Sequence, residues 1–401
     1  GALFCALPGT RADGHDFAAV AVAAGAAAVL AERPLDLPVP VYVVADARLG
    51  TALAAAALAG HPSHQLVVVG VTGTNGKTTT AYLARAVLEA AGRPCGLIGT
   101  VEARVGGRAL PVTHTTPDAV ALQDLLGRMR SAGDTACAME VSSHALDQRR
   151  VAGVRFAAAL FTNLTRDHLD YHPDVESYYA AKRALFARPP GEGEDPPGAA
   201  NLDDPYGRRL ARETGALGFS IDADDAAVRP ERVEGLATGI RARVATPRGP
   251  LEIASGLRGR FNLSNLAGVV ALGELLELPH AAVAAGIAAV AGVPGRFEAL
   301  DCGQGFPVIV NSAHTPAPPA TCGPASVRSP RRSSPATRRS TAARAATGSW
   351  RRRTPSTAAR CGASASSSPD STSPSTSPTA STSRRCRTRR RTSSPSSRTP
   401  A

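Results

Sequence analysis

The sequence is poor in lysine: of its 45 lysines and arginines, only Lys77 and Lys182 are lysine. A protein that otherwise uses arginine is expected to keep a lysine where a guanidinium group cannot serve. No apolar run is long enough to span a membrane, although 43% of the residues are hydrophobic, which favours a soluble protein. The seven cysteines form no C-x-x-C pair, so neither a disulfide framework nor a zinc ribbon is indicated, and a reducing cytoplasm fits best.

The chain also lacks an initiator methionine and a signal peptide, and it opens at Gly1 inside a strand-like pattern. We therefore expect a further N-terminal segment in the natural protein. Residues 1–62 alternate short strand-like and helical patterns, which predicts a small α/β domain. Residues 63–296 repeat a strand–helix rhythm, which predicts a parallel, doubly wound sheet with flanking helices. The predicted strands span residues 66–69, 96–100, 136–140 and 157–162, and the predicted helices run from 79 to about 91, 119–130, 175–187 and 263–276.

Past His314 the composition changes abruptly. Residues 315–401 hold 17 arginines and one acid, Asp370, so the net charge of this tail is +16. The net charge of the whole chain is +12, which leaves −4 for residues 1–314. The tail has too few large apolar residues to offset its ordering entropy by burial. We interpret residues 317–401 as a disordered, low-complexity tail produced by a gene read in the wrong frame. A basic nucleic-acid-binding tail or an arginine/serine-rich segment is the alternative.

The stretch G-V-T-G-T-N-G-K-T-T-T, Gly70–Thr80, follows an apolar β-branched run and precedes a helical pattern. Its glycines let the backbone turn tightly and aim N–H groups at an anion over the helix N-terminus. Lys77 would then reach the β- and γ-phosphates of a nucleotide, and Thr78 would place its hydroxyl on Mg²⁺. The strict phosphate-loop pattern needs glycine where Val71 stands, so a plain glycine-rich turn with a surface lysine is the alternative.

Four other patches carry candidate functional side chains. Glu140 ends a predicted strand, where a second Mg²⁺ contact belongs, although a salt bridge at the sheet edge is the alternative. His168 lies in F-T-N-L-T-R-D-H-L-D-Y-H, where a zinc site is conceivable but the spacing matches no standard set. Lys182 lies on an amphipathic helix; such a lysine is usually a solvated charge, but its rarity here favours a functional role. The last patch, R-G-R-F-N-L-S-N-L-A-G with G-V-P-G-R-F-E, supplies Asn265 and Arg296.

The order of these motifs resembles that of the Mur ligases, ATP-dependent enzymes that attach amino acids to a UDP-linked peptidoglycan precursor. The resemblance covers residues 1 to about 316, and the family's loop departs from the strict pattern as this loop does. Its motifs are G-x-T-G-T-N-G-K-T-T, T-T-P-D-A, M-E-V-S-S-H-A-L, T-N-L-T-R-D-H-L-D-Y-H, A-K-x-x-L-F, F-N-L-S-N and G-V-P-G-R-F-E. They are most similar to those of members that add a diamino acid to UDP-MurNAc-L-Ala-D-Glu.

The resemblance implies an ATP site that holds two Mg²⁺ ions. Thr78 and Glu140 would hold one ion, and His168 and Lys182 the other, with Lys182 as a carbamate. A guanidinium group could not form that carbamate because it stays protonated. Lys77, Glu140, His168 and Lys182 are thus the implied catalytic residues. The implied ATP contacts are Gly73, Thr74, Asn75, Gly76, Lys77, Thr78, Thr79, Asn265 and Arg296.

The resemblance also implies a site for UDP-MurNAc-L-Ala-D-Glu. Thr10, Arg11 and Ala12 match the loop on its uridine side. The other matching positions are His114, where asparagine is common, Thr115, Thr116, Ser142, Gln148 and Arg150. In the implied reaction the D-Glu side-chain carboxylate attacks the γ-phosphate, and the amine of the diamino acid then displaces phosphate from the acyl phosphate. We also expect the protein to be a cytoplasmic monomer that binds neither membrane nor nucleic acid.

The sequence departs from the family near its C-terminal end. A C-terminal ligase domain is expected to begin at residues 297–316, where the family's D-Y-A-H-[TN]-P reads N-S-A-H-T-P at 311–316. No D-N-P-R motif follows, although the family binds the incoming amino acid with it. We therefore predict that this chain binds ATP and the precursor but ligates poorly. Phosphate release that requires both the precursor and a diamino acid would contradict this prediction.

Two other hypotheses remain open. One is a nucleotide- and UDP-sugar-binding remnant without catalysis, which substrate-dependent ATP turnover would exclude. The other is a ligase similar to folylpolyglutamate synthase, against which the patches E-V-S-S-H-A-L-D-Q-R-R and L-F-C-A-L-P-G-T-R-A-D-G-H-D-F argue. The sequence leaves open whether the added residue is meso-diaminopimelate or L-lysine.

Overall fold

A sheet of buried strands lies at the centre of the described chain. The computed structural model describes residues 1–9, 12–187, 194–236, 238–300 and 308–311. Several predictions therefore fall on residues outside the described ones: Thr10 and Arg11, residues 301–307 and 312–316 of the predicted start of a C-terminal domain, and the predicted tail at 317–401.

The central sheet has eight strands in the order β11-β10-β9-β4-β8-β5-β6-β7. The strands from β11 to β5 run parallel, and β6 and β7 add an antiparallel edge. All residues of β5, β8, β9 and β10 are buried, as in a parallel sheet that is covered on both faces. The bounds are Val67–Thr72 (β4), Cys95–Ile98 (β5), Ala103–Val105 (β6), Arg108–Leu110 (β7), Ala136–Glu140 (β8), Ala158–Phe161 (β9), Gly198–Asn201 (β10) and Leu217–Phe219 (β11).

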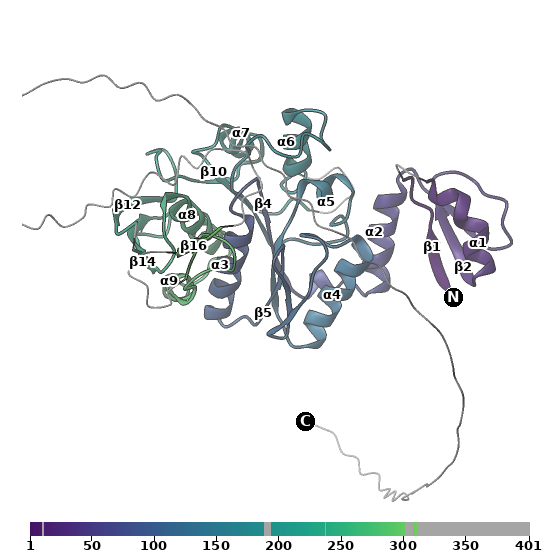
Figure 1. Ribbon diagram of the computed structural model, residues 1–401, viewed down its shortest axis with the longest axis horizontal. Helices are drawn as coiled ribbons and strands as arrows, with labels where there is room; N and C mark the ends of the chain where they lie inside the picture. Colours follow the sequence, from purple (N-terminus) through teal and green to yellow (C-terminus); the bar gives the residue numbers. More distant parts are fainter. Residues whose placement is uncertain (10–11, 188–193, 237, 301–307, 312–401) are drawn as a thin grey trace, which may run out of the picture. The chain divides into compact units, whose positions relative to one another are not determined.

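Alternate residues of the strands face two different hydrophobic cores. Val69 and Val71 of β4 join a core with α3, α8 and α9, whereas Val68 joins a core with α4, α6 and α7. Figure 1 shows α3, α8 and α9 on one side of β4 and β5, with α4 on the other. These bounds are Lys77–Ala90 (α3), Ala119–Ser131 (α4), Ser143–Asp147 (α5), Val175–Arg183 (α6), Pro205–Thr214 (α7), Arg260–Leu275 (α8) and His280–Ala289 (α9). The predicted doubly wound α/β fold is confirmed.

The first part of the chain forms a separate three-stranded parallel sheet, β1-β2-β3. Its elements are β1 (Ala2–Cys5), η1 (Gly14–Phe17), α1 (Ala18–Ala23), β2 (Ala26–Ala31), β3 (Val41–Val43), α2 (Ala47–Leu58) and η2 (Pro62–His64). Residues 18–31, which are rich in alanine, are divided between α1 and β2 because Gly25, at a φ of 99°, turns the chain between them. The predicted small α/β domain is confirmed as a fold, and its boundary at residue 62 stays a prediction.

A second small sheet was not predicted from the sequence. Strands β12 (Arg229–Glu234), β13 (Ile240–Ala245) and β14 (Leu251–Ser255) pair antiparallel. Ile240, Ala242 and Val244 are buried while the residues between them are exposed or half-buried, the alternation expected of a sheet with one solvated face. A further antiparallel pair, β15 (Glu298–Leu300) with β16 (Val308–Val310), lies within residues 297–316, and the start of a C-terminal domain there stays a prediction.

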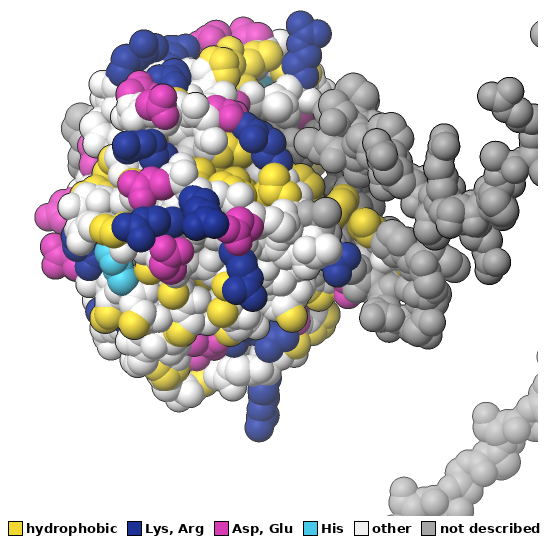
Figure 2. Space-filling model, turned by 90° about the vertical axis from the view of Figure 1, so that its left-hand side faces the viewer, with side chains coloured by type: hydrophobic (Ala, Val, Ile, Leu, Met, Phe, Trp, Pro, Cys, Tyr) yellow, Lys and Arg dark blue, Asp and Glu magenta, His cyan; other side chains and the backbone are white. Residues whose placement is uncertain are grey.

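The surface beside this second sheet carries charges of both signs. Arg243 bonds Glu231 and Glu252 across neighbouring strands, at 3.0 and 3.3 Å. Figure 2 shows basic and acidic side chains interspersed on this side of the molecule, so no single basic patch covers the visible face. None of the described helices is long and apolar enough to cross a membrane.

Several predicted element boundaries were wrong: the strand predicted over 66–69 reaches Thr72, and the helix predicted over 263–276 begins at Arg260. The helix expected from Thr79 starts at Lys77 because Gly76, at a φ of 86°, turns the chain directly into it. The helix expected over 175–187 ends at Arg183. The earlier start matters because it places Lys77 and Thr78 in the first turn of α3, where backbone N–H groups have no partner within the helix.

The contact between α9 and α3 predicts the effect of one substitution. A Cβ at Gly286 of α9 would lie 2.6 Å from the backbone nitrogen of Val87 in α3, so Gly286→Ala must push the helices apart. We expect it to lower the free energy of unfolding by about 1–3 kcal/mol in urea denaturation. Gly127→Ala is the matched control, because a Cβ at Gly127 of α4 meets nothing within 4 Å and helix propensity favours alanine by about 1 kcal/mol. Equal stability of the two variants would contradict this packing.

Candidate functional site

The loop between β4 and α3 approaches its neighbours so closely that glycine is required. Gly76 has a φ of 86°, and a Cβ there would lie 2.5 Å from Oδ1 of Asn265 on α8. Gly73 has a φ of 141°, and a Cβ there would collide with the hydroxyl of Thr162 after β9. Alanine at either position would therefore be strained by its backbone and by contact. Thr79 is buried in the first turn of α3, beside Thr80, whose hydroxyl lies 3.4 Å from Oδ1 of Asn265.

Side chains that follow β9 hold this loop in place. The Asn163 side chain accepts a hydrogen bond from the Asn75 amide at 2.9 Å and donates one to the Asn75 carbonyl at 3.1 Å. Thr162 donates to the same carbonyl at 2.6 Å, and the Thr74 amide donates to the Asn163 carbonyl at 2.8 Å. Thr162 and Asn163 were not among the residues predicted from the sequence. Their position in the sequence could have indicated them, because they directly follow β9, the parallel strand beside β4, and so lie at the same edge of the sheet as the loop.

Lys77 folds back onto the loop that precedes it. Its ammonium group donates to the carbonyls of Gly73 and Thr74, each at 2.9 Å. Burial lowers the pKa of Lys77, the Glu140 carboxylate opposes that shift, and the positive charge of Arg296 adds to it. Arg296, which follows α9, is therefore within electrostatic range of the same ammonium group.

Glu140 is buried at the carboxyl end of β8, the neighbour of β4. One carboxylate oxygen accepts from the Thr100 amide at 2.7 Å. The other accepts from the hydroxyls of Thr78 at 3.0 Å and Thr100 at 3.1 Å. The structure thus brings Thr78 and Glu140 into contact, and these three contacts of Glu140 are hydrogen bonds, unlike the edge salt bridge considered from the sequence.

Lys182 lies on the inner face of α6 and is 1% exposed. Its ammonium group donates to the Gly73 carbonyl at 3.0 Å, the same oxygen that Lys77 contacts, and lies 4.4 Å from the ring centre of Tyr178. Burial, followed by the charge of Lys77, lowers the pKa of Lys182 well below its ordinary value. The alternative of a solvated surface lysine is therefore wrong.

His168 lies at the edge of this cluster. Its side chain is 42% exposed, and its Nε2 lies 3.5 Å from Asp167. Its ring is 4.9 Å from that of His144 and 6.0 Å from that of Tyr178, which in turn bonds the Thr74 hydroxyl at 3.1 Å. Across the described ranges, no three histidine, cysteine, aspartate or glutamate side chains are grouped so that they could hold a metal, so the conceivable zinc site finds no support.

Five of the residues expected to hold the precursor lie along one hydrogen-bonded path: Thr115, Thr116, Ser142, Gln148 and Arg150. Thr116 donates to the Glu140 carbonyl at 2.8 Å and accepts from the Ser142 amide at 3.1 Å. Arg150 donates to the Thr116 carbonyl at 3.0 Å and to the Gln148 side chain at 2.7 and 3.1 Å. The hydroxyls of Thr115 and Thr100 are 3.1 Å apart. His114 is exposed, and Ala12 is an exposed residue of the first domain.

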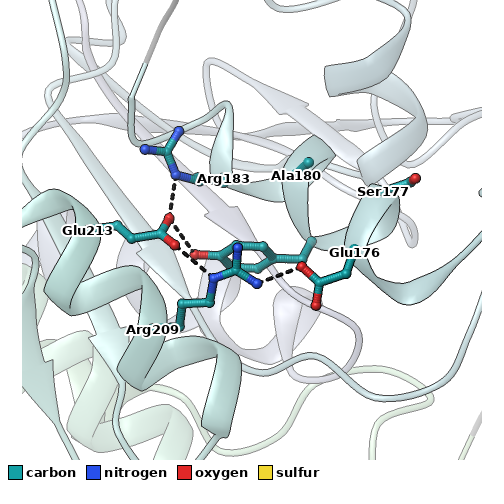
Figure 3. A pocket seen from close by; sticks show the side chains of 7 residues that line it. Glu176, Ser177, Ala180, Arg183, Arg209 and Glu213 are labelled. Carbon is teal, nitrogen blue, oxygen red and sulfur yellow. Dashed lines mark hydrogen bonds and ion pairs between the residues drawn. The ribbon is translucent and has the colours of Figure 1, made fainter.

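The outer face of α6 packs against α7 around a separate pocket of about 560 Å³, lined by Glu176, Ser177, Tyr179, Ala180, Arg183, Arg209 and Glu213. Arg209 bonds Glu176 at 2.5 Å and Glu213 at 2.7 Å, and Arg183 bonds Glu213 at 2.6 Å. Figure 3 shows these charged groups directed at one another rather than into open space. The network holds the helix that carries Lys182, and its charges are already paired.

A glycine-rich loop between a buried parallel strand and a helix that begins Lys-Thr defines a nucleotide-binding protein of the phosphate-loop class. The chain belongs to the Mur ligase family. The model for the Mur ligase middle domain matches residues 71–273, and the model described as the Mur ligase family, catalytic domain, matches residues 1–69. The resemblance stated from the motifs is confirmed.

Several named proteins are similar to this chain in sequence or in fold. UDP-N-acetylmuramoyl-L-alanyl-D-glutamate–2,6-diaminopimelate ligase of Geobacter metallireducens is 45% identical over 321 residues, which cover 79% of this chain and 63% of the relative. The chain thus spans less than two thirds of that relative's length. A solved structure with the same name is 28% identical, with a TM-score of 0.65 over 75% of this chain and 62% of the other. A solved structure of folylpolyglutamate synthase from Mycobacterium tuberculosis is 20% identical, with a TM-score of 0.55. The match covers 67% of this chain and 68% of the synthase, and at this identity it shows a shared fold alone.

The two hydrogen bonds between the Asn163 side chain and the Asn75 backbone, which we call the clamp, predict a role for Asn163 in nucleotide binding. Asn163→Ala removes both bonds to Asn75, so the loop loses part of its preformed shape. We expect the affinity for a non-hydrolysable ATP analogue to fall about tenfold in calorimetric titration, the loss expected from one or two neutral hydrogen bonds. Ser131→Ala, which removes a side-chain bond to a backbone carbonyl on α4, is the control and should bind normally. An unchanged affinity in Asn163→Ala would show that the loop holds its shape without the clamp.

Proposed function

We propose that this protein is an ATP-dependent ligase of peptidoglycan synthesis, which adds a diamino acid to UDP-MurNAc-L-Ala-D-Glu through an acyl phosphate. The convergence of Lys77, Thr78 and Glu140 beside the glycine loop is the observation that carries the proposal. Diaminopimelate is the favoured diamino acid, because the relatives of this chain are named for it. A cytoplasmic location and a monomeric state remain part of the proposal.

The phosphates of ATP would lie over the first turn of α3. Backbone N–H groups in the first turn of α3, at residues 77–79, and the Lys77 ammonium group supply positive charge there. The carbonyls of Gly73 and Thr74 fix that ammonium group, so little reorganisation is needed when the γ-phosphate arrives. Asn265 and Arg296 extend the site toward the rest of the nucleotide, since Asn265 approaches Gly76 and Arg296 acts on Lys77.

The donor set beside the loop fits Mg²⁺. Thr78 and Glu140 offer a hydroxyl and a carboxylate that already lie in contact, and Mg²⁺ prefers such oxygen ligands. His168 and Lys182 would hold a second ion. When bound, Mg²⁺ neutralises charge on the transferred phosphoryl group.

Lys182 fits a metal site only after carbamylation, because an ammonium group repels a cation. Its lowered pKa, caused by burial and by Lys77, increases the fraction of neutral amine. The neutral amine attacks the carbon of CO₂, a C–N bond forms, and one proton leaves to give the carbamate anion. That anion would replace one of two adjacent positive charges by a negative one with two oxygen donors.

Arg150 would bind an anionic group of the precursor. In the part of the chain that the structure describes, its hydrogen bonds go to two neutral oxygens, the Thr116 carbonyl and the Gln148 amide. Its charge is thus not matched by a bonded carboxylate. A precursor carboxylate oriented from here would attack the γ-phosphorus, ADP would leave, and the amine of the diamino acid would attack the acyl carbon and expel phosphate.

The test measures binding and turnover separately. Calorimetric titration is expected to show binding of UDP-MurNAc-L-Ala-D-Glu and of a Mg²⁺–ATP analogue. The variant Glu140→Gln is expected to bind the Mg²⁺–ATP analogue more weakly. Phosphate release should be faster with meso-diaminopimelate than with L-lysine, although the expectation of weak ligation stays a prediction. Failure to bind the precursor would contradict the proposal. Binding without turnover under either amino acid would favour the non-catalytic remnant.

A further inference from the structure

Tyr171 connects two segments that contribute to the candidate site. It follows β9, three residues after His168, and its ring lies 4.0 Å from the ring of His144 on α5. Its hydroxyl donates to Oδ2 of Asp147 at 2.6 Å and accepts from Nε2 of Gln148 at 3.1 Å. Both partners lie at the end of α5, so the tyrosine joins the loop after β9 to the segment that carries Gln148 and Arg150.

Both of these segments contain a strained backbone. His168 has a φ of 54° and Arg149 a φ of 57°, in the left-handed region that non-glycine residues rarely adopt. Such conformations persist where the surroundings over-determine them. Helix α5 has only five residues, so its own hydrogen bonds give little support to the residues that follow it. The two bonds of Tyr171 are side-chain contacts that join these strained regions.

The donor and acceptor pattern leaves one orientation for the Gln148 amide. An ionised Asp147 only accepts, so the Tyr171 hydroxyl hydrogen is directed at it, and the tyrosine oxygen is left to accept. The NH₂ of Gln148 therefore faces Tyr171, and its oxygen faces Arg150. The guanidinium group has no acceptor of its own and bonds that oxygen through Nε and Nη2 at 3.1 and 2.7 Å.

We infer that Tyr171 is a positioning residue for the precursor, because its hydroxyl fixes the Gln148 amide and, through it, the Arg150 guanidinium group. This inference rests on the proposed function of the site. Without the hydroxyl, Arg150 is the remaining side-chain partner described for the Gln148 amide, so the Gln148 side chain can change its conformation and carry the bonded oxygen away from its position. Arg150 then loses a fixed direction, although the residues of the phosphate loop are unaffected.

Tyr171→Phe tests the inference, because it keeps the ring against His144 and removes only the hydroxyl. We expect calorimetric titration to show about tenfold weaker binding of UDP-MurNAc-L-Ala-D-Glu, with unchanged binding of a Mg²⁺–ATP analogue and an unchanged melting temperature. Tyr206→Phe is the matched control, since the Tyr206 hydroxyl also bonds a carboxylate, Glu176 at 3.1 Å, but on the far face of α6. The control should bind both ligands as the wild type does.

A double-mutant cycle separates positioning from direct contact. If Tyr171 acts through Gln148, then Tyr171→Phe adds no further loss in a Gln148→Ala background. Additive losses overturn the inference, and so does precursor binding by Tyr171→Phe at wild-type affinity; both outcomes leave the proposed function intact. Equal weakening of both ligands also overturns it, because that result indicates a general structural defect. Failure of the wild type to bind the precursor overturns the proposed function and, with it, the role of Tyr171.

Discussion

The carbonyl oxygen of Gly73 accepts hydrogen bonds from both lysines of the protein, and the rest of the site depends on this contact. Lys77 and Lys182 approach it at 2.9 and 3.0 Å, one from the first turn of α3 and the other from the inner face of α6. Two ammonium groups that share one oxygen in a buried place repel each other. The repulsion falls when an anion binds beside them or when one of the two loses its charge. In the proposed function, a bound triphosphate would supply that anion, and carbamylation would remove the positive charge of Lys182.

The parallel sheet explains how residues so far apart in sequence reach this point. Strands β4, β8 and β9 are neighbours, and each ends at the same edge. The glycine loop follows β4, Glu140 ends β8, and Thr162 and Asn163 follow β9. Ligands in open α/β sheets bind at this carboxyl edge. The proposed ligase therefore uses the fold for position and the loops for chemistry, and Arg150 extends the same edge toward the precursor.

Much of this arrangement could be predicted from the sequence, because apolar runs mark buried strands and a polar residue at a run's end marks the sheet edge. Glu140 and the loop of Gly73 and Gly76 followed from that rule. The clamp by Asn163 did not, because a side chain that bonds a backbone 88 residues away leaves no local pattern. The antiparallel sheet of β12–β14 was missed for another reason. Its alternation of buried and exposed residues is visible in I-R-A-R-V-A, but the strand–helix rhythm before it favoured more parallel units.

The most direct measurement uses the fact that Lys77 and Lys182 are the only lysines in the chain. Selective isotope labelling of lysine side chains gives two NMR signals, which Lys182→Arg assigns. We expect the pKa of Lys182 to lie well below the ordinary lysine value, the pKa of Lys77 to be lowered less, and both signals to shift when a Mg²⁺–ATP analogue is added. Two lysines that both titrate near about 10.4, the value of a solvated side chain, and that ignore the nucleotide would contradict this expectation.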